Sequence, residues 1–253
     1  MGWKILSDQQ ISSMIQEQVQ IALVQEENRF EKELRLKQAN LATLQSQINP
    51  HFLYNTLECI RGMALLNDQE EIADLAWSLS RFFRYSISGK SNFASLREEI
   101  NNIQDYAKIQ NYRFQNRFSL IVDEAESVME SLLPRLTLQP VVENAILHGL
   151  QDTTEGGIIK ISIQPIGSDI CLTISDNGCG MTPEALENLS NKIMYGEEEK
   201  KNIKGHTGIG MHNVDRRLKL YYGPAYGITV YSTESVGTDV EIRFPAATEE
   251  REQ

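Results

Sequence analysis

The stretch that most limits the fold lies near the N-terminus, where residues 5–48 contain neither glycine nor proline. The stretch is rich in Gln, Glu, Leu, Lys and Ala, which favour helices, so we expect one long helix. A heptad seam is apolar at six of its eight positions, which are Leu23, Glu27, Phe30, Leu34, Lys37, Leu41, Leu44 and Ile48. So narrow a stripe is typical of a coiled coil between chains. The alternative is an amphipathic helix packed on its own chain.

Pro50 interrupts this helical pattern directly before His51. Because proline has no N–H and its ring clashes with the carbonyl four residues earlier, we expect a kink that presents the His51 imidazole. A lone histidine beside a helix break is more often a core or capping residue than a functional one. The helical pattern continues over residues 52–60, breaks at residues 66–68 and resumes over residues 71–85, which predicts a helical hairpin.

A third helix is predicted after the hairpin. It opens with the capping-box pattern Ser95-Leu-Arg-Glu98 and runs to about Arg113. Paired hairpins would give a four-helix bundle. The N-terminal part is therefore expected to be helical.

The C-terminal half alternates between strand and helix patterns. Strands are expected over residues 117–123, 157–163, 170–175, 227–231 and 238–244. Helices are expected from Pro134 to Leu150, from Pro183 onward, and from Met211 to Tyr222. Hairpins interleaved with helices predict a mixed, mostly antiparallel sheet covered on one face by helices. The expected fold class is α+β, with a helical part followed by a two-layer α/β sandwich.

Composition argues against several function classes. The chain has 24 Lys and Arg against 35 Asp and Glu, a net charge of −11, which argues against nucleic acid held by bulk electrostatics. Cys59, Cys171 and Cys179 form no C-x-x-C, so neither a disulfide framework nor a zinc site is expected. No apolar run approaches the roughly 20 residues that span a bilayer. We expect a soluble, cytoplasmic chain, and a helix that starts at Trp3 suggests a membrane or sensory segment upstream.

Three glycine-containing segments stand out: residues 140–149 (PVVENAILHG), 176–180 (DNGCG) and 205–213 (GHTGIGMHN). Singly each is weak, because such turns after strands and before helices are common. Together, in this order, on a helix, a strand end and a helix N-terminus, they resemble the N, G1 and G2 boxes of one ATP-binding fold. That fold, the Bergerat fold, is shared by gyrase, Hsp90, MutL and the sensor histidine kinases.

The residues of these segments suit a nucleotide. Gly208 and Gly210 let backbone N–H groups approach phosphate oxygens at the positive end of the following helix. The resemblance assigns Asp176 to adenine and Asn144 to Mg²⁺, which accepts a neutral oxygen ligand while keeping its waters. It also places at the nucleotide His148, Gly178, Gly180, Lys204 and Asn213. For His148 a structural hydrogen bond is an equal alternative.

Residues 47–55 (QINPHFLYN) are similar to the phosphoacceptor motif of the LytS/YesM-like sensor histidine kinases. The same subfamily is matched by Arg84, Tyr85, Tyr106, Asn213, Val214, Arg217, Leu218, Tyr222 and Gly223. The resemblance covers about residues 45–245 and implies that His51 accepts phosphate. ATPases of the superfamily carry a water-activating Glu four residues before the Mg²⁺-binding Asn, where this chain has Pro140. Phosphoryl transfer to another nucleophile is therefore favoured over hydrolysis.

The general base is left open by the sequence. Many histidine kinases place an acidic residue directly after the phosphoacceptor, but here it is Phe52, as is usual for this subfamily. Asn55, one turn on, can hold the tautomer that exposes a nucleophilic nitrogen, yet it cannot take a proton. Glu58 is a weak candidate for the base. Glu143, directly before Asn144, is kept among the catalytic candidates.

We therefore expect a histidine kinase region whose C-terminal domain binds Mg²⁺ and ATP and whose His51 attacks the γ-phosphoryl group. The expected parts are a signalling coiled-coil helix (1–46), dimerisation and phosphotransfer helices (47–115), a catalytic ATP-binding domain (116–247) and a tail (248–253). Expected partners are a second copy of the chain and a response-regulator receiver domain, with the membrane reached only through an upstream region. The alternatives are an ATPase clamp like Hsp90 or MutL and a non-catalytic nucleotide-binding scaffold.

Overall fold

The computed structural model describes part of the chain. The described residues are 50–87, 91–196 and 209–247. The expected coiled-coil helix (1–46), the expected tail (248–253) and the segment in which a kink before Pro50 was expected lie outside them. The chain forms two compact units, Met1–Leu53 and Tyr54–Gln253, and each is described by itself.

The predicted helical hairpin is confirmed. Its helices are α2 (Pro50–Leu66) and α3 (Glu70–Ile87). Within the second unit, the Tyr54 hydroxyl donates to the Phe83 carbonyl at 3.4 Å. Further along α2, the Arg61 guanidinium lies 4.5 Å from the centre of the Trp77 ring. Because the later residue of α2 meets the earlier residue of α3, the two helices are antiparallel.

A five-stranded sheet forms the platform of the C-terminal part. Its strands, in spatial order, are β2 (Phe118–Asp123), β4 (Gly157–Ile166), β5 (Asp169–Asp176), β7 (Gly237–Pro245) and β6 (Gly227–Thr233). The pair β2 and β4 is parallel, and the other neighbouring pairs are antiparallel. The prediction of a mixed, mostly antiparallel sheet is confirmed.

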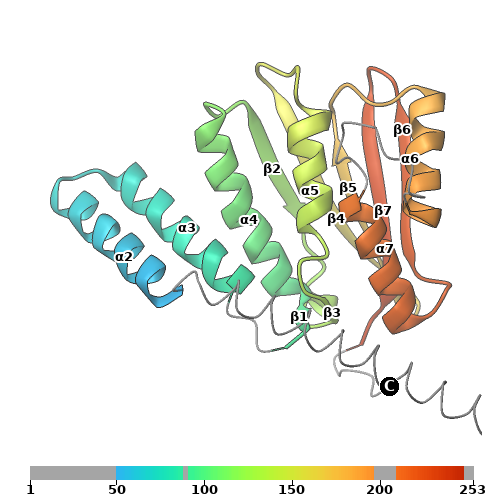
Figure 1. Ribbon diagram of the computed structural model, residues 1–253, viewed down its shortest axis with the longest axis horizontal. Coiled ribbons are helices and arrows are strands. Elements are labelled where there is room, and N and C mark those ends of the chain that lie inside the picture. Colours follow the sequence, from blue (N-terminus) through green and yellow to red (C-terminus); the bar gives the residue numbers. More distant parts are fainter. Residues whose placement is uncertain (1–49, 88–90, 197–208, 248–253) are drawn as a thin grey trace, which may run out of the picture. The chain divides into compact units, whose positions relative to one another are not determined.

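Helices cover one face of this sheet (Figure 1). They are α4 (Leu96–Arg113), α5 (Gln139–Asn144), α6 (Pro183–Tyr195) and α7 (Ile209–Tyr222). The alternation along β4 explains the layering, because Ile159, Ile161 and Ile163 are buried whereas Lys160 and Gln164 are exposed. The two-layer α/β sandwich is thus confirmed. Within the described ranges, no helix combines the length and the apolarity needed to cross a membrane.

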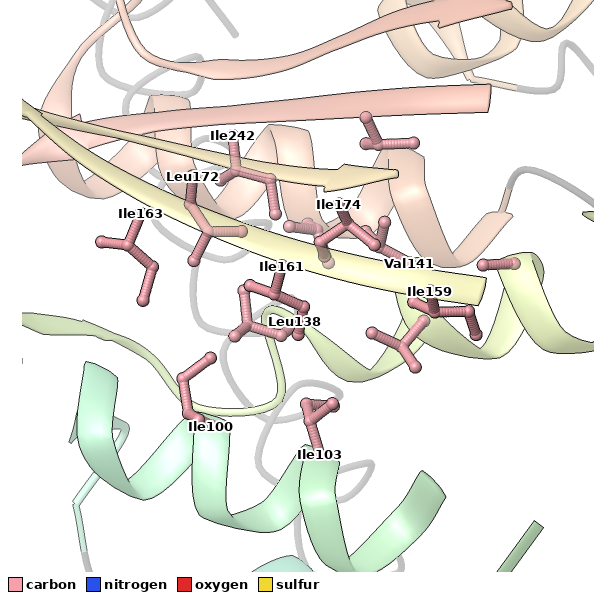
Figure 2. Close-up of a cluster of buried hydrophobic side chains, with 14 of the residues drawn as sticks. Ile100, Ile103, Leu138, Val141, Ile159, Ile161, Ile163, Leu172, Ile174 and Ile242 are labelled. Carbon is pink, nitrogen blue, oxygen red and sulfur yellow. The ribbon is translucent and has the colours of Figure 1, made fainter. Parts of the chain in front are cut away.

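The helix α4 shares the core of the sheet. Figure 2 shows Ile100 and Ile103 of α4 pointing toward Ile161 and Ile163 of β4. The predicted capping box opens this helix, since the Ser95 hydroxyl accepts the backbone N–H three residues on at 3.2 Å. The proposed domain boundary between residues 115 and 116 stays a prediction.

One expected helix start is wrong. The helix predicted from Pro134 begins at Gln139, and residues Leu132–Pro134 instead form a strand, β3. This strand pairs antiparallel with β1 (Phe93–Ser95), a small sheet that the sequence did not suggest. Leu136 has φ 58°, in the left-handed region, so the chain turns sharply there and cannot continue as a helix. After α5 the chain makes one wider, π-helical turn over Ala145–Gly149.

The one-sided layering can be tested on a single strand. Ile161→Ala should lower the free energy of unfolding by about 3 kcal/mol, because the side chain is fully buried and its loss leaves a cavity. Ile158 of the same strand is 40% exposed, so Ile158→Ala should cost about 1 kcal/mol or less. Urea denaturation followed by circular dichroism measures both. Equal losses would contradict the assignment of the covered face.

Candidate functional site

A cavity of about 270 Å³ lies between the sheet and the helices α5, α6 and α7. Its apolar walls are formed by Val141, Ala145, Ile174, Met181, Leu189, Met211, Val230 and Val240. Its other lining residues are Asn144, His148, Gly149, Gln151, Asp176, Cys179, Gly180 and Thr238. Mostly apolar walls with a few convergent polar groups are typical of a small-molecule site. Asn144, His148, Asp176 and Gly180, which were expected from different segments, therefore meet in one cavity.

Asp176, the last residue of β5, is the acidic side chain among the described lining residues. Its Oδ1 accepts the N–H of Gly178 at 2.9 Å, and Thr238 lies opposite it on the paired strand β7. Burial raises the pKa of Asp176, while the backbone N–H groups of Gly178 and Thr238 act in the opposite direction. The carboxylate is thus held in a fixed orientation, where it can accept a hydrogen bond from a ligand amine.

Two glycines allow the helical turn after α5 to touch the end of β5. A Cβ added at Gly149 would lie 2.8 Å from the Asp176 carboxyl group. A Cβ added at Gly178 would lie 2.0 Å from the Gly149 carbonyl oxygen, which already accepts the Cys179 N–H at 2.9 Å. Both distances are too short for any side chain. The absence of side chains here brings the polar residues of the first two glycine segments to the same cavity wall.

Asn144 ends α5, and His148 lies on the π-helical turn that follows. The wider turn is supported by Arg117, whose guanidinium donates at 3.4 Å to the carbonyl groups of Ile146 and Gln151. The guanidinium also lies 4.1 Å from the centre of the Phe114 ring. Single π-helical turns inside helices are frequent at functional sites. Arg117 therefore has a supporting role that the sequence did not reveal.

Glu143 does not line the cavity, although it directly precedes Asn144. Burial is the main cause that raises the pKa of Tyr106 on α4 to about 12, and the charge of Glu143 adds to this effect. Glu143 therefore lies near α4, and its place among the catalytic candidates stays a prediction.

The third glycine segment is described from α7 onward. Gly210, in the first turn of α7, lies against α5, since a Cβ there would be 3.0 Å from the Pro140 side chain. The next residue, Met211, lines the cavity, whereas Asn213 is exposed on α7. Lys204 and Gly208 lie outside the described residues. The roles expected of Lys204, Gly208, Gly210 and Asn213 stay predictions.

The phosphoacceptor candidate belongs to the first unit. His51 is exposed in the first turn of α2, and Asn55 is exposed one turn later on the same helix. An exposed imidazole on a rigid helix can be reached by a reactant. The role of each residue stays a prediction.

Some lining residues were missed by the sequence analysis. Thr238 faces Asp176 in the register of β5 and β7, and Val240 follows two residues later on the same face. The alternation of the strand predicts which residues share a face, but not which strand lies beside β5. Leu189 of α6 and Gln151 carry no local signal of a site.

The chain is similar to known proteins over most of its length. Residues 39–118 match a family model described as histidine kinase, and residues 133–248 match one described as histidine kinase-, DNA gyrase B- and HSP90-like ATPase. The chain is 37% identical to the sensor histidine kinase YesM of Bacillus subtilis over 88% of its own length and 36% of YesM. It is 32% identical to the sensor protein LytS of Oceanobacillus iheyensis over 83% of its length and 35% of LytS. It is also 32% identical to the sensor histidine kinase BtsS of Escherichia coli K12, over 83% and 34%. The chain thus spans about a third of the length of these relatives.

The glycine contact in the cavity wall can be tested by adding one methyl group. Gly178→Ala should lower the free energy of unfolding by about 2 kcal/mol or more, because the new Cβ would overlap the Gly149 carbonyl. Gly62→Ala, on α2, is the control, since its Cβ would meet nothing within 4 Å. There alanine should stabilise the helix by up to about 1 kcal/mol. A urea midpoint for Gly178→Ala that equals the wild-type midpoint would contradict the contact.

Proposed function

Because the chain belongs to the sensor histidine kinase family, in the group that includes YesM and LytS, we propose that it transfers the γ-phosphoryl group of ATP to its own His51. The observation that carries the proposal is the cavity in the ATP-binding domain, with Asn144 and Asp176 in its lining. Transfer is favoured over hydrolysis because hydrolysis needs a base that activates water. The acidic side chain among the described lining residues is Asp176, and its Oδ1 already accepts a backbone N–H. The ATPases of the superfamily carry their water-activating Glu at the position where α5 has Pro140, and proline has no acidic group.

The cavity suits the adenine ring of ATP. Ile174, Val230 and Val240 provide apolar walls for a flat ring, and the Asp176 carboxylate can accept an N–H from the exocyclic amine. The missing side chains at Gly149 and Gly178 allow this carboxylate to lie against the wall. We therefore assign Asp176 to the recognition of adenine.

Asn144 is our candidate ligand for Mg²⁺. Its neutral amide oxygen is the kind of ligand that Mg²⁺ accepts while water and phosphate oxygens complete the coordination. When bound, the ion would neutralise charge on the phosphates. We propose that His148, Gly180, Lys204, Gly208, Gly210 and Asn213 surround the rest of the nucleotide. The backbone N–H groups at the start of α7 favour an anion in spite of the acidic chain.

The proposed reaction forms a bond between a nitrogen of the His51 imidazole and the γ-phosphorus. The bond from this phosphorus to the bridging oxygen breaks, and ADP leaves with the electron pair. The attacking ring must be neutral, and Asn55 is proposed to hold the tautomer that exposes the attacking nitrogen. Since Phe52 follows His51, the group that takes the ring proton must come from another residue, for which Glu58 and Glu143 remain candidates.

Partners follow from the same proposal. The helices α2 and α3 expose large apolar side chains, among them Ile60, Met63, Leu65, Leu66 and Ile72. Exposed apolar stripes of this kind favour pairing with a second hairpin, so we propose a homodimer that the seam around Leu34 and Leu41 would extend. The phosphoryl group would then pass to an aspartate of a response-regulator receiver domain. We also propose a cytoplasmic location, with the membrane reached only through an upstream region.

Recognition of adenine can be tested at Asp176. Asp176→Asn should raise the Kd for ATP, measured by calorimetry with Mg²⁺ present, about 10-fold, because the amide keeps the size of the side chain but loses the charged acceptor. Asp123→Asn is the control, since Asp123 is also the last residue of a strand but is exposed on β2. Equal affinity in Asp176→Asn and the wild type would show that the site is misassigned.

The phosphoacceptor can be tested with γ-labelled ATP. The labelled chain should lose its label in acid and keep it in alkali, because a phosphorylated imidazole is a phosphoramidate. His51→Gln should remove the label and leave the Kd for ATP unchanged. Label that persists in His51→Gln, or that survives acid, would mean that another side chain is the nucleophile.

A further inference from the structure

Glu99 is a buried carboxylate that the proposed reaction does not use. It lies on α4 and is fully buried. Its oxygens accept the backbone N–H groups of Leu136 at 2.6 Å, Thr137 at 2.9 Å and Leu138 at 3.0 Å. A fourth donor is the hydroxyl group of Tyr85 on α3. One side chain thus joins two helices and a turn.

A carboxylate in this place is hard to explain by stability alone. Burial raises the pKa of Glu99, and the four hydrogen bonds act in the opposite direction. Well-packed apolar residues often stabilise a core as much as buried charged groups do. Hydrogen bonds, however, fix directions and distances, which apolar contacts do not. The arrangement therefore points to positioning.

The group that Glu99 positions is the helix that carries Asn144. The three N–H groups converge because Leu136 is in the left-handed region, a backbone shape that forms anion-binding concavities. Leu138 is the residue from which α5 starts, and α5 has only 6 residues. A shift of the turn at residues 136–138 would therefore displace Asn144 at the other end of this short helix.

The same turn is held from the opposite side by α7. The Arg217 guanidinium donates to the carbonyl oxygens of Arg135 at 2.8 Å and Leu136 at 3.2 Å. Glu99 thus binds the N–H groups of the turn while Arg217 binds its carbonyl groups. Since α7 also carries Met211 of the cavity wall, the turn links two sides of the cavity.

The end of α3 is attached to this turn by more than one contact. Besides the Tyr85 hydroxyl bond to Glu99, the Arg135 guanidinium donates to the Tyr85 carbonyl at 2.8 Å. The same guanidinium lies 3.9 Å from the centre of the Tyr85 ring. A displacement of α3 at Tyr85 therefore changes the hydrogen bonds that hold the start of α5.

We propose that Glu99 is a positioning residue that couples the end of α3 to the metal ligand Asn144, so that the position of Tyr85 sets how well the cavity binds Mg²⁺ with its nucleotide. The inference rests on the proposed function in taking Mg·ATP as the ligand. Glu99 does not touch the ligand, and its effect passes through the turn at residues 136–138 and α5. The hairpin would thus act on the nucleotide site through Tyr85 and Glu99.

The test compares nucleotide affinity with and without the ion. Calorimetry with a non-hydrolysable ATP analogue gives one Kd in Mg²⁺ and one in EDTA, and their ratio measures the contribution of the ion. Glu99→Gln should reduce this ratio about 10-fold, as expected for residues that orient a metal ligand. Tyr85→Phe keeps the ring on Arg135 and removes one donor, so it should reduce the ratio about threefold.

Asp105→Asn is the matched control. Asp105 is a buried acidic residue on α4, and its carboxyl group lies 2.9 Å from the Arg81 guanidinium of α3. The hydrogen bonds to the turn at residues 136–138 come from Glu99 and not from Asp105. Its variant should leave the ratio unchanged even where it lowers the melting temperature. A general loss of stability cannot produce this pattern, because the ratio is measured on folded protein.

The outcomes separate this inference from the proposed function. An unchanged ratio in Glu99→Gln or in Tyr85→Phe would overturn the inference, as would an equal reduction in Asp105→Asn. If Glu99→Gln does not fold, Tyr85→Phe decides, since it leaves the carboxylate and its three backbone donors in place. A wild-type chain whose nucleotide affinity is the same in Mg²⁺ and EDTA would overturn the proposed metal site and this inference with it.

Discussion

The placement of α3 and of the turn before α5 against α4 depends on one buried acidic side chain, that of Glu99. Removing a carboxylate from water costs several kcal/mol unless hydrogen-bond donors of the protein replace its hydration. Here the donors come from α3 and from the turn before α5, which lie far apart in the sequence. Apolar packing is not directional, so it would tolerate several placements of these elements. The hydrogen bonds of Glu99 select one placement, and the surrounding apolar side chains close around it.

The cavity depends on two positions that have no side chain, Gly149 and Gly178. The sheet supplies a rigid wall because the buried isoleucines of β4 and β5 pack against α4 and α5. Gly149 and Gly178 then allow backbone segments to approach more closely than any other residue would permit. Asp176 is thereby held by the backbone N–H of Gly178, with its carboxyl group at the cavity. A fixed acceptor in an apolar slot is the arrangement that the proposed recognition of adenine requires.

Two side chains next to each other in sequence are separated by the geometry of α5. Asn144 lines the cavity, whereas Glu143 lies near Tyr106 of α4. Successive residues of a helix point about 100° apart, so Glu143 can face away from the wall that Asn144 lines. With Pro140 in the first turn, α5 contributes an amide and no acid to the cavity. This distribution supports the proposed transfer to a histidine over hydrolysis, because hydrolysis needs a base that activates water.

Local signals in the sequence determined much of this protein. The alternation along β4, the capping box at Ser95 and the glycine segments indicated the sandwich, the start of α4 and four of the cavity residues, Asn144, His148, Asp176 and Gly180, because each depends on neighbours within a few positions. The start of α5, the strand pair β1 and β3, and the place of Thr238 beside Asp176 were decided by tertiary structure. Tertiary structure also decided the burial of Glu99, because the sequence alone indicates an exposed acidic residue on the surface of a helix. Its three backbone donors lie more than thirty positions away along the chain, and only the folded backbone brings them to Glu99.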